Sequence, residues 1–246
     1  MNKQLLIALI IILVGGGIYG IYRSTQKPAT DTTSEVESMQ TPTEQKDTMQ
    51  QDEVKTTDST AGCVRNVDEN VLKTAKVETK NQFVTMDVKG FGSIKVQLYD
   101  QDAPKTVENF LRLTNAGYYN CITFHRVAKG FVIQGGDPTG TGAGGDSAFG
   151  GEFADELNPS ALSYKAGYKK GVLAMANRGP NTNTSQFFIM LGDVELPKNY
   201  TIFGKVIVGL DVVDKIGAVE IIPQMGATDG KPVEPIVIEK ATISAK

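Results

Sequence analysis

The chain has 246 residues, of which 40% are hydrophobic, 22% charged and 7% aromatic. This composition fits a folded protein and excludes collagen, a coiled coil and a wholly disordered chain. The net charge of −3 arises in residues 1–62, because residues 63–246 hold twenty acidic and twenty basic residues. A neutral main domain has no long-range field to attract nucleic acid, so nucleic acid is not expected as a partner.

Residues 5–22 form an uncharged apolar run between Lys3 and Arg23. As an α-helix this run would be roughly 27 Å long, just enough to cross a hydrocarbon core of about 30 Å. We therefore expect residues 1–23 to be a transmembrane anchor with its N-terminus inside, or else a secretory signal that is cleaved off. Under either interpretation the rest of the chain leaves the cytosol.

Residues 24–62 contain ten threonines, no aromatic residue and a net charge of −5. A segment of this composition cannot bury enough apolar surface to offset the entropy of ordering its backbone. We expect a disordered acidic linker over 24–62, then an N-terminal extension of the domain over 63–81, and the main domain over 82–246.

The main domain begins with strand patterns. Apolar residues alternate with polar ones over 84–88 and again over 94–98. The segment 89–92 between them contains two glycines, and together these features predict a β-hairpin.

A helix is expected after the hairpin. Asp102 is placed to cap it, Pro104 suits its first turn, and Gly117 would end it. Its buried face would carry four residues that follow a helical period, Val107, Phe110, Leu111 and Thr114. A second, short helix is expected over 209–216.

The remaining strands are expected to be short and to lie near 122–127, 131–135, 172–176, 186–190, 202–207 and 235–242. With the hairpin they make eight strands, accompanied by only two helices. So few helices argue against a parallel sheet with helical crossovers. The expected fold class is mainly β, a closed eight-stranded antiparallel barrel with no exposed edge, capped by two α-helices.

The glycine-rich segment Gly140–Gly145 matches the G-x-G-x-x-G pattern of dinucleotide-binding sites. Such a site needs a helix that begins at the glycines, whereas DSAFGGEFADE follows here, so we expect a flexible surface loop. His125 is the single histidine, which excludes any mechanism that needs two imidazoles and most histidine-rich metal sites.

Arg126 and Gln134 lie eight positions apart with a turn between them. Two adjacent strands could bring both side chains onto one face of the sheet. Phe131, Val132 and Phe188 could supply an apolar patch beside this polar pair. A cation and an amide next to an apolar patch indicate a candidate binding or catalytic site.

The segments FHRVAKGFVIQGGD from Phe124, MANRGPNTNTSQFFI from Met175 and FGKV from Phe203 closely resemble the cyclophilin-type peptidyl-prolyl cis–trans isomerases. The resemblance covers about 82–242, and the tyrosine at position 200 is similar to bacterial members. It implies the barrel described above, isomerase activity on X–Pro bonds, and no cofactor or metal ion. Proline-containing segments of client proteins are the implied partners of a monomeric domain.

By this resemblance, Arg126 is the catalytic residue that donates a hydrogen bond to the prolyl nitrogen at the twisted transition state, and Gln134 holds the substrate carbonyl. The residues implied to bind substrate are Phe131, Val132, Ala176, Asn177, Gln186, Phe188, Leu196 and Tyr200. The apolar members would grip the proline ring, the backbone of Ala176 and Asn177 would pair with the peptide, and Gln186 would orient Arg126.

The sequence departs from the family pattern at several positions. Glu195 stands where many eukaryotic cyclophilins carry a tryptophan that helps to bind cyclosporin, so weak inhibition by that drug is expected. Val132 replaces the usual methionine, and Tyr200 replaces a frequent histidine but keeps an apolar body with a hydroxyl. Strand alternation places His125 on the face opposite Arg126, so we interpret it as a packing residue.

Cys63 and Cys121 are the two cysteines. An extracytoplasmic compartment would permit a disulfide between them that ties residues 63–80 to the barrel, and two separate thiols are the alternative. The leading hypothesis is a membrane-tethered prolyl isomerase that assists protein folding on the far side of a prokaryotic membrane. The alternative is a non-catalytic module that binds prolyl peptides on the same fold.

Overall fold

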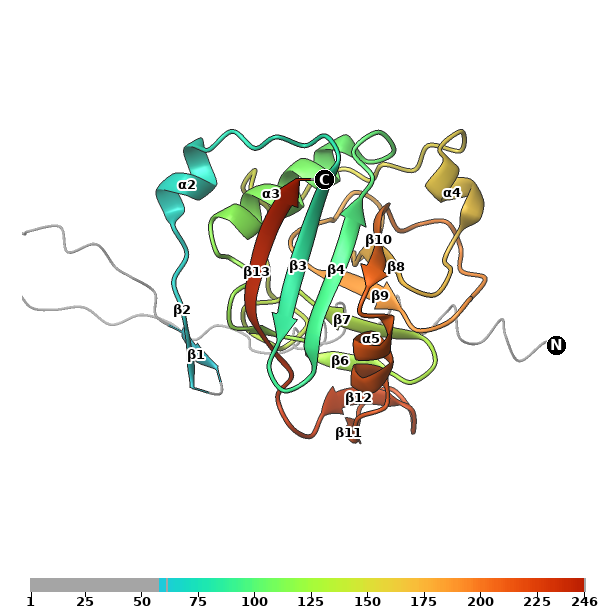
Figure 1. The fold of residues 1–246 in the computed structure, drawn as a ribbon. Helices are drawn as coiled ribbons and strands as arrows, with labels where there is room; N and C mark the ends of the chain where they lie inside the picture. The colour runs from blue at the N-terminus through green and yellow to red at the C-terminus, as the bar shows by residue number, and fades with distance from the viewer. Residues whose placement is uncertain (1–57, 61, 246) are drawn as a thin grey trace, which may run out of the picture.

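The computed structural model of the chain describes residues 58–60 and 62–245 (Figure 1). The strands described are β1 (Asp58–Thr60), β2 (Cys63–Arg65), β3 (Gln82–Val88), β4 (Gly92–Leu98), β5 (Ile122–Thr123), β6 (Arg126–Ala128), β7 (Val132–Gly135), β8 (Val172–Met175), β9 (Phe187–Met190), β10 (Ile202–Val208), β11 (Ile221–Pro223), β12 (Asp229–Pro232) and β13 (Val237–Ala245). The helices described are α2 (Glu69–Thr74), α3 (Pro104–Asn115), α4 (Leu162–Ala166) and α5 (Leu210–Gly217).

One antiparallel sheet organises the main domain, and β1 pairs separately with β2. Its strand order is β11-β12-β6-β7-β9-β8-β10-β4-β3-β13-β5. Figure 1 shows β13, β3, β4 and β10 side by side across the front of the molecule, with β6, β7 and β9 behind them. The order ends at β5, which is followed directly in the chain by β6, so the strands from β6 round to β5 start and end at one divided strand. The fold is therefore mainly β, as expected, with the eight predicted strand positions around the core and a break between β5 and β6, which are not hydrogen-bonded to each other.

The sheet has eleven strands where the sequence predicts eight. The stretch expected as one strand over 122–127 is divided into β5, which pairs with β13, and β6, which pairs with β7 and β12. The hairpin of β11 and β12 was not predicted at all. Both of its strands are short and end in proline, so neither shows the alternation by which a strand is recognised.

The predicted first hairpin is confirmed. β3 pairs with β4 so that Val84 lies opposite Val96 and Met86 opposite Ile94. All four side chains are fully buried. Gly90 in the connecting turn has a positive φ of 76°, a conformation that glycine adopts without steric cost.

Helix α3 carries the buried face that the sequence predicts, since Val107, Phe110, Leu111 and Thr114 are all buried. Phe110 lies at the centre of the main core. Its ring is 4.9 Å from that of Tyr119, 5.5 Å from that of Phe187 and 5.2 Å from that of Phe203, measured between centroids. These tilted and edge-on contacts join α3 to the inner face of the sheet.

The predicted cap of α3 is wrong. Ala103 occupies the N-cap position and makes no side-chain cap, while the carboxylate of Asp102 accepts a hydrogen bond from the backbone N–H of Ser163 instead (2.9 Å). The helix is capped from a distant part of the chain by Glu156. Its carboxylate accepts the backbone N–H groups of Lys105 (3.1 Å) and Thr106 (2.8 Å), which satisfies two of the free donors of the first turn.

The N-terminal extension is attached to the domain by a covalent bond and by packing. Cys63 and Cys121 form a disulfide, with their Cα atoms 5.5 Å apart. Val67, Leu72 and Val77 pack against the main core. Residues 58–60, which the sequence assigns to the linker, form β1 of a small hairpin at the start of this extension.

The predicted membrane anchor over 1–23 and the predicted disordered linker up to residue 57 lie outside the described residues. Within the described ranges, no helix has both the length and the apolar character needed to cross a bilayer.

Candidate active site

The polar and apolar residues of the candidate site form one row across neighbouring strands. In the register of the sheet, Arg126 on β6 lies opposite Gln134 on β7, which lies opposite Phe188 on β9, which lies opposite Ala174 on β8. Because residues opposite one another in a sheet point to the same side, this row lies on one face. The predicted neighbourhood of Arg126 and Gln134 is therefore confirmed.

The apolar residues of this face form a second hydrophobic cluster, separate from the main core, which we call the outer cluster. Its buried members are Ala128, Val132, Tyr168, Val172, Ala174, Phe188, Met190, Leu196 and Ile202, and the half-buried residues packed against it include Phe131, Ala176 and Tyr200. It contains every apolar residue that the sequence assigns to substrate binding. Since the half-buried members lie at its surface, Phe131 and Tyr200 offer more contact area to a ligand than Val132 does.

Arg126 is held by two partners. Its Nη1 donates to Oε1 of Gln134 (3.0 Å), as an interaction between paired strands allows. Its Nε and Nη2 donate to the two carboxylate oxygens of Asp229, at 2.8 Å and 2.6 Å. Asp229 is a residue that the sequence reasoning missed. It lies 103 positions away on the unpredicted strand β12, and no local pattern marks it.

A hydrogen-bonded chain continues from Gln134 into the glycine-rich loop. Nε2 of Gln134 donates to Oε1 of Gln186 (2.9 Å), and Nε2 of Gln186 donates to the carbonyls of Gly142 (3.0 Å) and Gly144 (2.7 Å). In this structure Gln186 therefore acts on Arg126 through Gln134 rather than directly. The loop over 140–145, which we expected to be a flexible surface loop, is therefore hydrogen-bonded to the site.

Asp137 also binds the glycine-rich loop, through hydrogen bonds to its backbone. Its buried carboxylate accepts hydrogen bonds from the backbone N–H groups of Thr139 (2.8 Å), Gly142 (2.6 Å) and Gly144 (3.1 Å). Burial by itself raises the pKa of Asp137. The hydrogen bonds from Thr139, Gly144 and Gly142 together lower it by a larger amount, so the net pKa lies below its ordinary value. The carboxylate is thus ionised near neutral pH and organises the turn around itself.

Ala176 and Asn177 leave the end of β8 beside the outer cluster. The backbone N–H of Ala176 already donates to the carbonyl of Gln186 (3.0 Å), so that group is not available to a bound peptide. The side chain of Asn177 donates to the carbonyl of Asn199 (2.9 Å). That contact braces the segment that carries Tyr200.

Tyr168 is a second residue that the sequence reasoning missed. Its hydroxyl donates to the carbonyl of Tyr200 (2.9 Å) and accepts from the backbone N–H of Tyr200 (3.1 Å), so it fixes the backbone of that residue. The ring of Tyr200 then lies edge-on to that of Phe188, with 5.6 Å between centroids. Burial raises the pKa of Tyr168 to about 12 and also raises the pKa of Tyr200, although the charge of Arg126 opposes the second shift.

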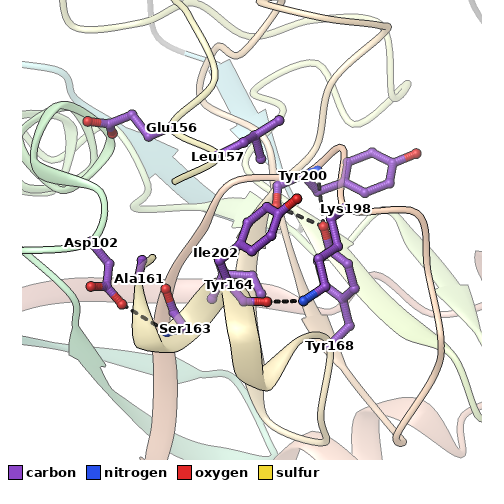
Figure 2. A pocket seen from close by; sticks show the side chains of 10 residues that line it. All are labelled: Asp102, Glu156, Leu157, Ala161, Ser163, Tyr164, Tyr168, Lys198, Tyr200 and Ile202. Atoms are coloured by element: carbon purple, nitrogen blue, oxygen red, sulfur yellow. Dashed lines mark hydrogen bonds between the residues drawn. The ribbon is translucent and has the colours of Figure 1, made fainter. Parts of the chain in front are cut away.

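A narrow pocket lies beside these tyrosines (Figure 2). Its lining residues are Asp102, Glu156, Leu157, Ala161, Ser163, Tyr164, Tyr168, Lys198, Tyr200 and Ile202. Figure 2 shows Asp102 and Ser163 at one end and Tyr168 with Lys198 at the other, where Nζ of Lys198 donates to the carbonyl of Tyr164. Asp102, Tyr168 and Lys198 already form hydrogen bonds with other residues that line the pocket. We therefore interpret this pocket as part of the packing beside Tyr200.

His125 is a buried residue in the segment between β5 and β6, outside the row. Its side chain is 7% exposed, and neither ring nitrogen has a hydrogen-bond partner among the described residues. It lines a separate cavity together with Thr123, Pro138, Pro232 and other residues. Burial lowers the pKa of His125 from 6.5 to about 4; the nearby charge of Asp137 opposes this shift and that of Arg126 adds to it.

This lowered pKa predicts a loss of stability in acid. Between pH 6.5 and about 4 the unfolded chain binds a proton at His125 that the folded chain does not, so the free energy of unfolding should fall as the pH falls through this window. The loss should reach at most about 3 kcal/mol. Denaturant unfolding at pH 7 and 4.5 measures it, and His125→Gln should remove this share of the pH dependence. An unchanged pH dependence in the variant would contradict the prediction.

Comparison with known proteins identifies the family. Residues 83–243 match the model of the cyclophilin type peptidyl-prolyl cis-trans isomerase/CLD family. Peptidyl-prolyl cis-trans isomerase ppi1 of Schizosaccharomyces pombe is 48% identical over 151 residues, which are 61% of this chain and 92% of that protein. Peptidyl-prolyl cis-trans isomerase-like 1 of Homo sapiens is 48% identical over the same length, 61% of this chain and 86% of that protein.

A solved structure is also similar. The crystal structure of a cyclophilin type peptidyl-prolyl cis-trans isomerase from Cryptosporidium parvum has 38% sequence identity and a TM-score of 0.58, and the match covers 67% of this chain and 98% of that one. A second crystal structure of that protein was obtained in the presence of the dipeptide Ala-Pro, with a TM-score of 0.57.

The chain therefore belongs to the cyclophilin-type peptidyl-prolyl cis–trans isomerase family, and it is an enzyme of that type. The relatives described above are eukaryotic, so they give no support to the bacterial likeness that the sequence suggests.

Proposed function

We propose that the chain accelerates rotation about X–Pro bonds by directing the guanidinium of Arg126 at the prolyl nitrogen, while the proline ring lies against the outer cluster. The observation that carries this proposal is the row on one face of the sheet, in which Arg126 and Gln134 lie next to Phe188. Replacing Arg126 tests the mechanism directly, because it leaves the apolar surface in place.

The chemistry requires no bond to be broken. An X–Pro amide resists rotation by roughly 18–20 kcal/mol, because the nitrogen lone pair is delocalised into the carbonyl. At the twisted transition state that lone pair returns to the nitrogen, which can then accept a hydrogen bond. A fixed donor aimed at this nitrogen stabilises the transition state more than the planar ground state, and only such a difference raises the rate.

Arg126 retains donors for this role. An arginine side chain has five N–H donors, and the contacts to Gln134 and Asp229 use three of them. One N–H remains on each of Nη1 and Nη2. The side chain is 14% exposed, so these donors lie at the surface of the site rather than in the core.

The other residues would bind the peptide around this donor. Phe131 and Tyr200 border the proline ring at the surface of the outer cluster, and Phe188 forms its floor. The backbone of Asn177 pairs with the extended substrate, since the N–H of Ala176 is already used by Gln186. The amide of Gln134, held by Gln186, meets the substrate carbonyl.

We also propose that the enzyme works outside the cytosol, on proteins that fold beyond a membrane to which residues 5–22 tether it. Two observations support this location. One is the apolar run itself. The other is the disulfide between Cys63 and Cys121, because such bonds persist in oxidising compartments and are rare in the cytosol.

Fractionation of cells that express the full chain tests the location. We expect the chain to sediment with membranes, to be released by detergent and not by alkaline carbonate, and to resist thiol alkylation until it is reduced. A matched chain without residues 1–27 should stay soluble and become alkylated without reduction. A full chain found in the cytosolic fraction with two free thiols would overturn the proposal, whereas a shortened chain in the medium would favour cleavage of a signal.

A further inference from the structure

Asp229 lies where it can reach Arg126 from a neighbouring strand. β12 pairs with β6 so that Asp229 is opposite Ala128 and Gly230 is opposite Val127. Arg126 is two positions from Ala128 on the same strand, so Asp229 and Arg126 are diagonal neighbours on one face of the sheet. Long side chains can bridge that diagonal.

The contact differs from the other ion pairs of the described chain. Asp229 and Arg126 are joined by two parallel hydrogen bonds, and their side chains are only 16% and 14% exposed. In every other ion pair between described residues at least one partner is more than 40% exposed. Two-point pairing of a guanidinium with a shielded carboxylate fixes its orientation, whereas an exposed pair does little.

The backbone that carries Asp229 is itself well held. Its carbonyl accepts the N–H groups of Gln224 (2.9 Å) and Met225 (3.1 Å), and the carbonyl of Thr228 accepts the N–H of Lys129 on the other side (2.8 Å). A side chain at Gly230 would place its Cβ only 2.0 Å from the carbonyl oxygen of Ile222, so this glycine lets β11 pack closely against β12. The carboxylate is therefore presented from a tightly built hairpin.

We propose that Asp229 is a positioning residue for the isomerase reaction, and this inference rests on the proposed role of Arg126. By occupying Nε and one N–H of Nη2, Asp229 fixes the plane of the guanidinium and turns the remaining Nη donors toward the outer cluster. It also neutralises most of the long-range charge of Arg126. Catalysis then depends on a directed hydrogen bond rather than on a diffuse positive field.

The first test is Asp229→Asn, which keeps the shape of the side chain and removes its charge and one acceptor. We expect kcat/KM for an Ala-Pro peptide to fall about tenfold, mainly through kcat, because the donor is no longer fixed in the reactive orientation. Asp214→Asn is the matched control. It breaks an exposed ion pair with Lys170 and should leave both kinetic constants unchanged.

A double-mutant cycle distinguishes the two proposals. If Asp229 acts through Arg126, Asp229→Asn should cause no further loss of kcat/KM when it is added to Arg126→Ala. Full activity of Arg126→Ala alone would overturn the proposed mechanism. An inactive Arg126→Ala together with a fully active Asp229→Asn would overturn only the positioning role, and so would an additive loss in the double variant.

A measurement on the unaltered protein covers the case in which Asp229→Asn does not fold. The Nε–H of Arg126 should exchange with solvent much more slowly than that of Arg178, whose side chain is about half exposed and contacts Glu152 through Nη2 alone. NMR of the arginine Nε–H groups detects this difference. Equal exchange rates would show that the pair with Asp229 does not persist in solution and would refute the inference.

Discussion

Replacing Arg126 with alanine is expected to lower kcat/KM for an X–Pro peptide by about a hundredfold or more. The variant loses the only side chain of the row that is positively charged. KM should change much less than kcat, because Phe131, Phe188 and Tyr200 still form the apolar surface. A protease-coupled isomerisation assay on an Ala-Pro-Phe type peptide measures both constants.

Two controls make this result specific. Arg65→Ala removes an arginine of the N-terminal extension whose guanidinium lies over the ring of Tyr118. Isomerase activity should therefore be unchanged. Arg126→Ala also leaves the shielded carboxylate of Asp229 without its partner, which can destabilise the fold. Thermal unfolding must therefore show that the variant is folded at the assay temperature. An Arg126→Ala variant that is folded and retains most of its activity would exclude the proposed mechanism.

Replacing both Cys63 and Cys121 with serine is expected to lower the free energy of unfolding by about 2–5 kcal/mol. The bond closes a loop with a sequence separation of 58 residues, so its loss gives the unfolded chain much more conformational freedom. Denaturant unfolding of the two forms measures the difference. Isomerase activity under native conditions should stay near its normal value, because neither cysteine belongs to the row or to the outer cluster.

The reduced protein provides the control for this prediction. Unaltered protein in excess reductant should unfold at the same denaturant concentration as the double serine variant, since both lack the crosslink. Equal stability of the oxidised protein and the serine variant would contradict the predicted contribution of the bond.

The local parts of the site could be predicted because they depend on neighbours in the chain. Arg126 and Gln134 belong to adjacent strands joined by a tight turn, and the turn sets which residues lie opposite one another. The apolar face of α3 is likewise visible, because buried residues recur with the helical period. The resemblance to cyclophilins also named part of the outer cluster, namely Phe131, Val132, Ala176, Phe188, Leu196 and Tyr200.

The misses have a common physical reason. Asp229 and Tyr168 each act on the site through one side chain that bonds to a residue far away in the chain, and one carboxylate or hydroxyl leaves no periodic pattern. The sequence predicts Asp102 as the cap of α3, because capping by a residue next to the helix is the commoner arrangement. Folding instead brings Glu156 to the helix, 50 residues from Thr106.

From its own pattern, the sequence determined that the main domain is rich in β-structure, that α3 buries one face, and that Arg126 and Gln134 share a hairpin. Only the tertiary structure decided that the hairpin of β11 and β12 pairs with β6, and that Asp229 pairs with Arg126. Turn geometry and side-chain periodicity are properties of a few consecutive residues. The closing of a sheet and the partner of a buried charge depend instead on which distant segments the whole fold brings within hydrogen-bonding distance.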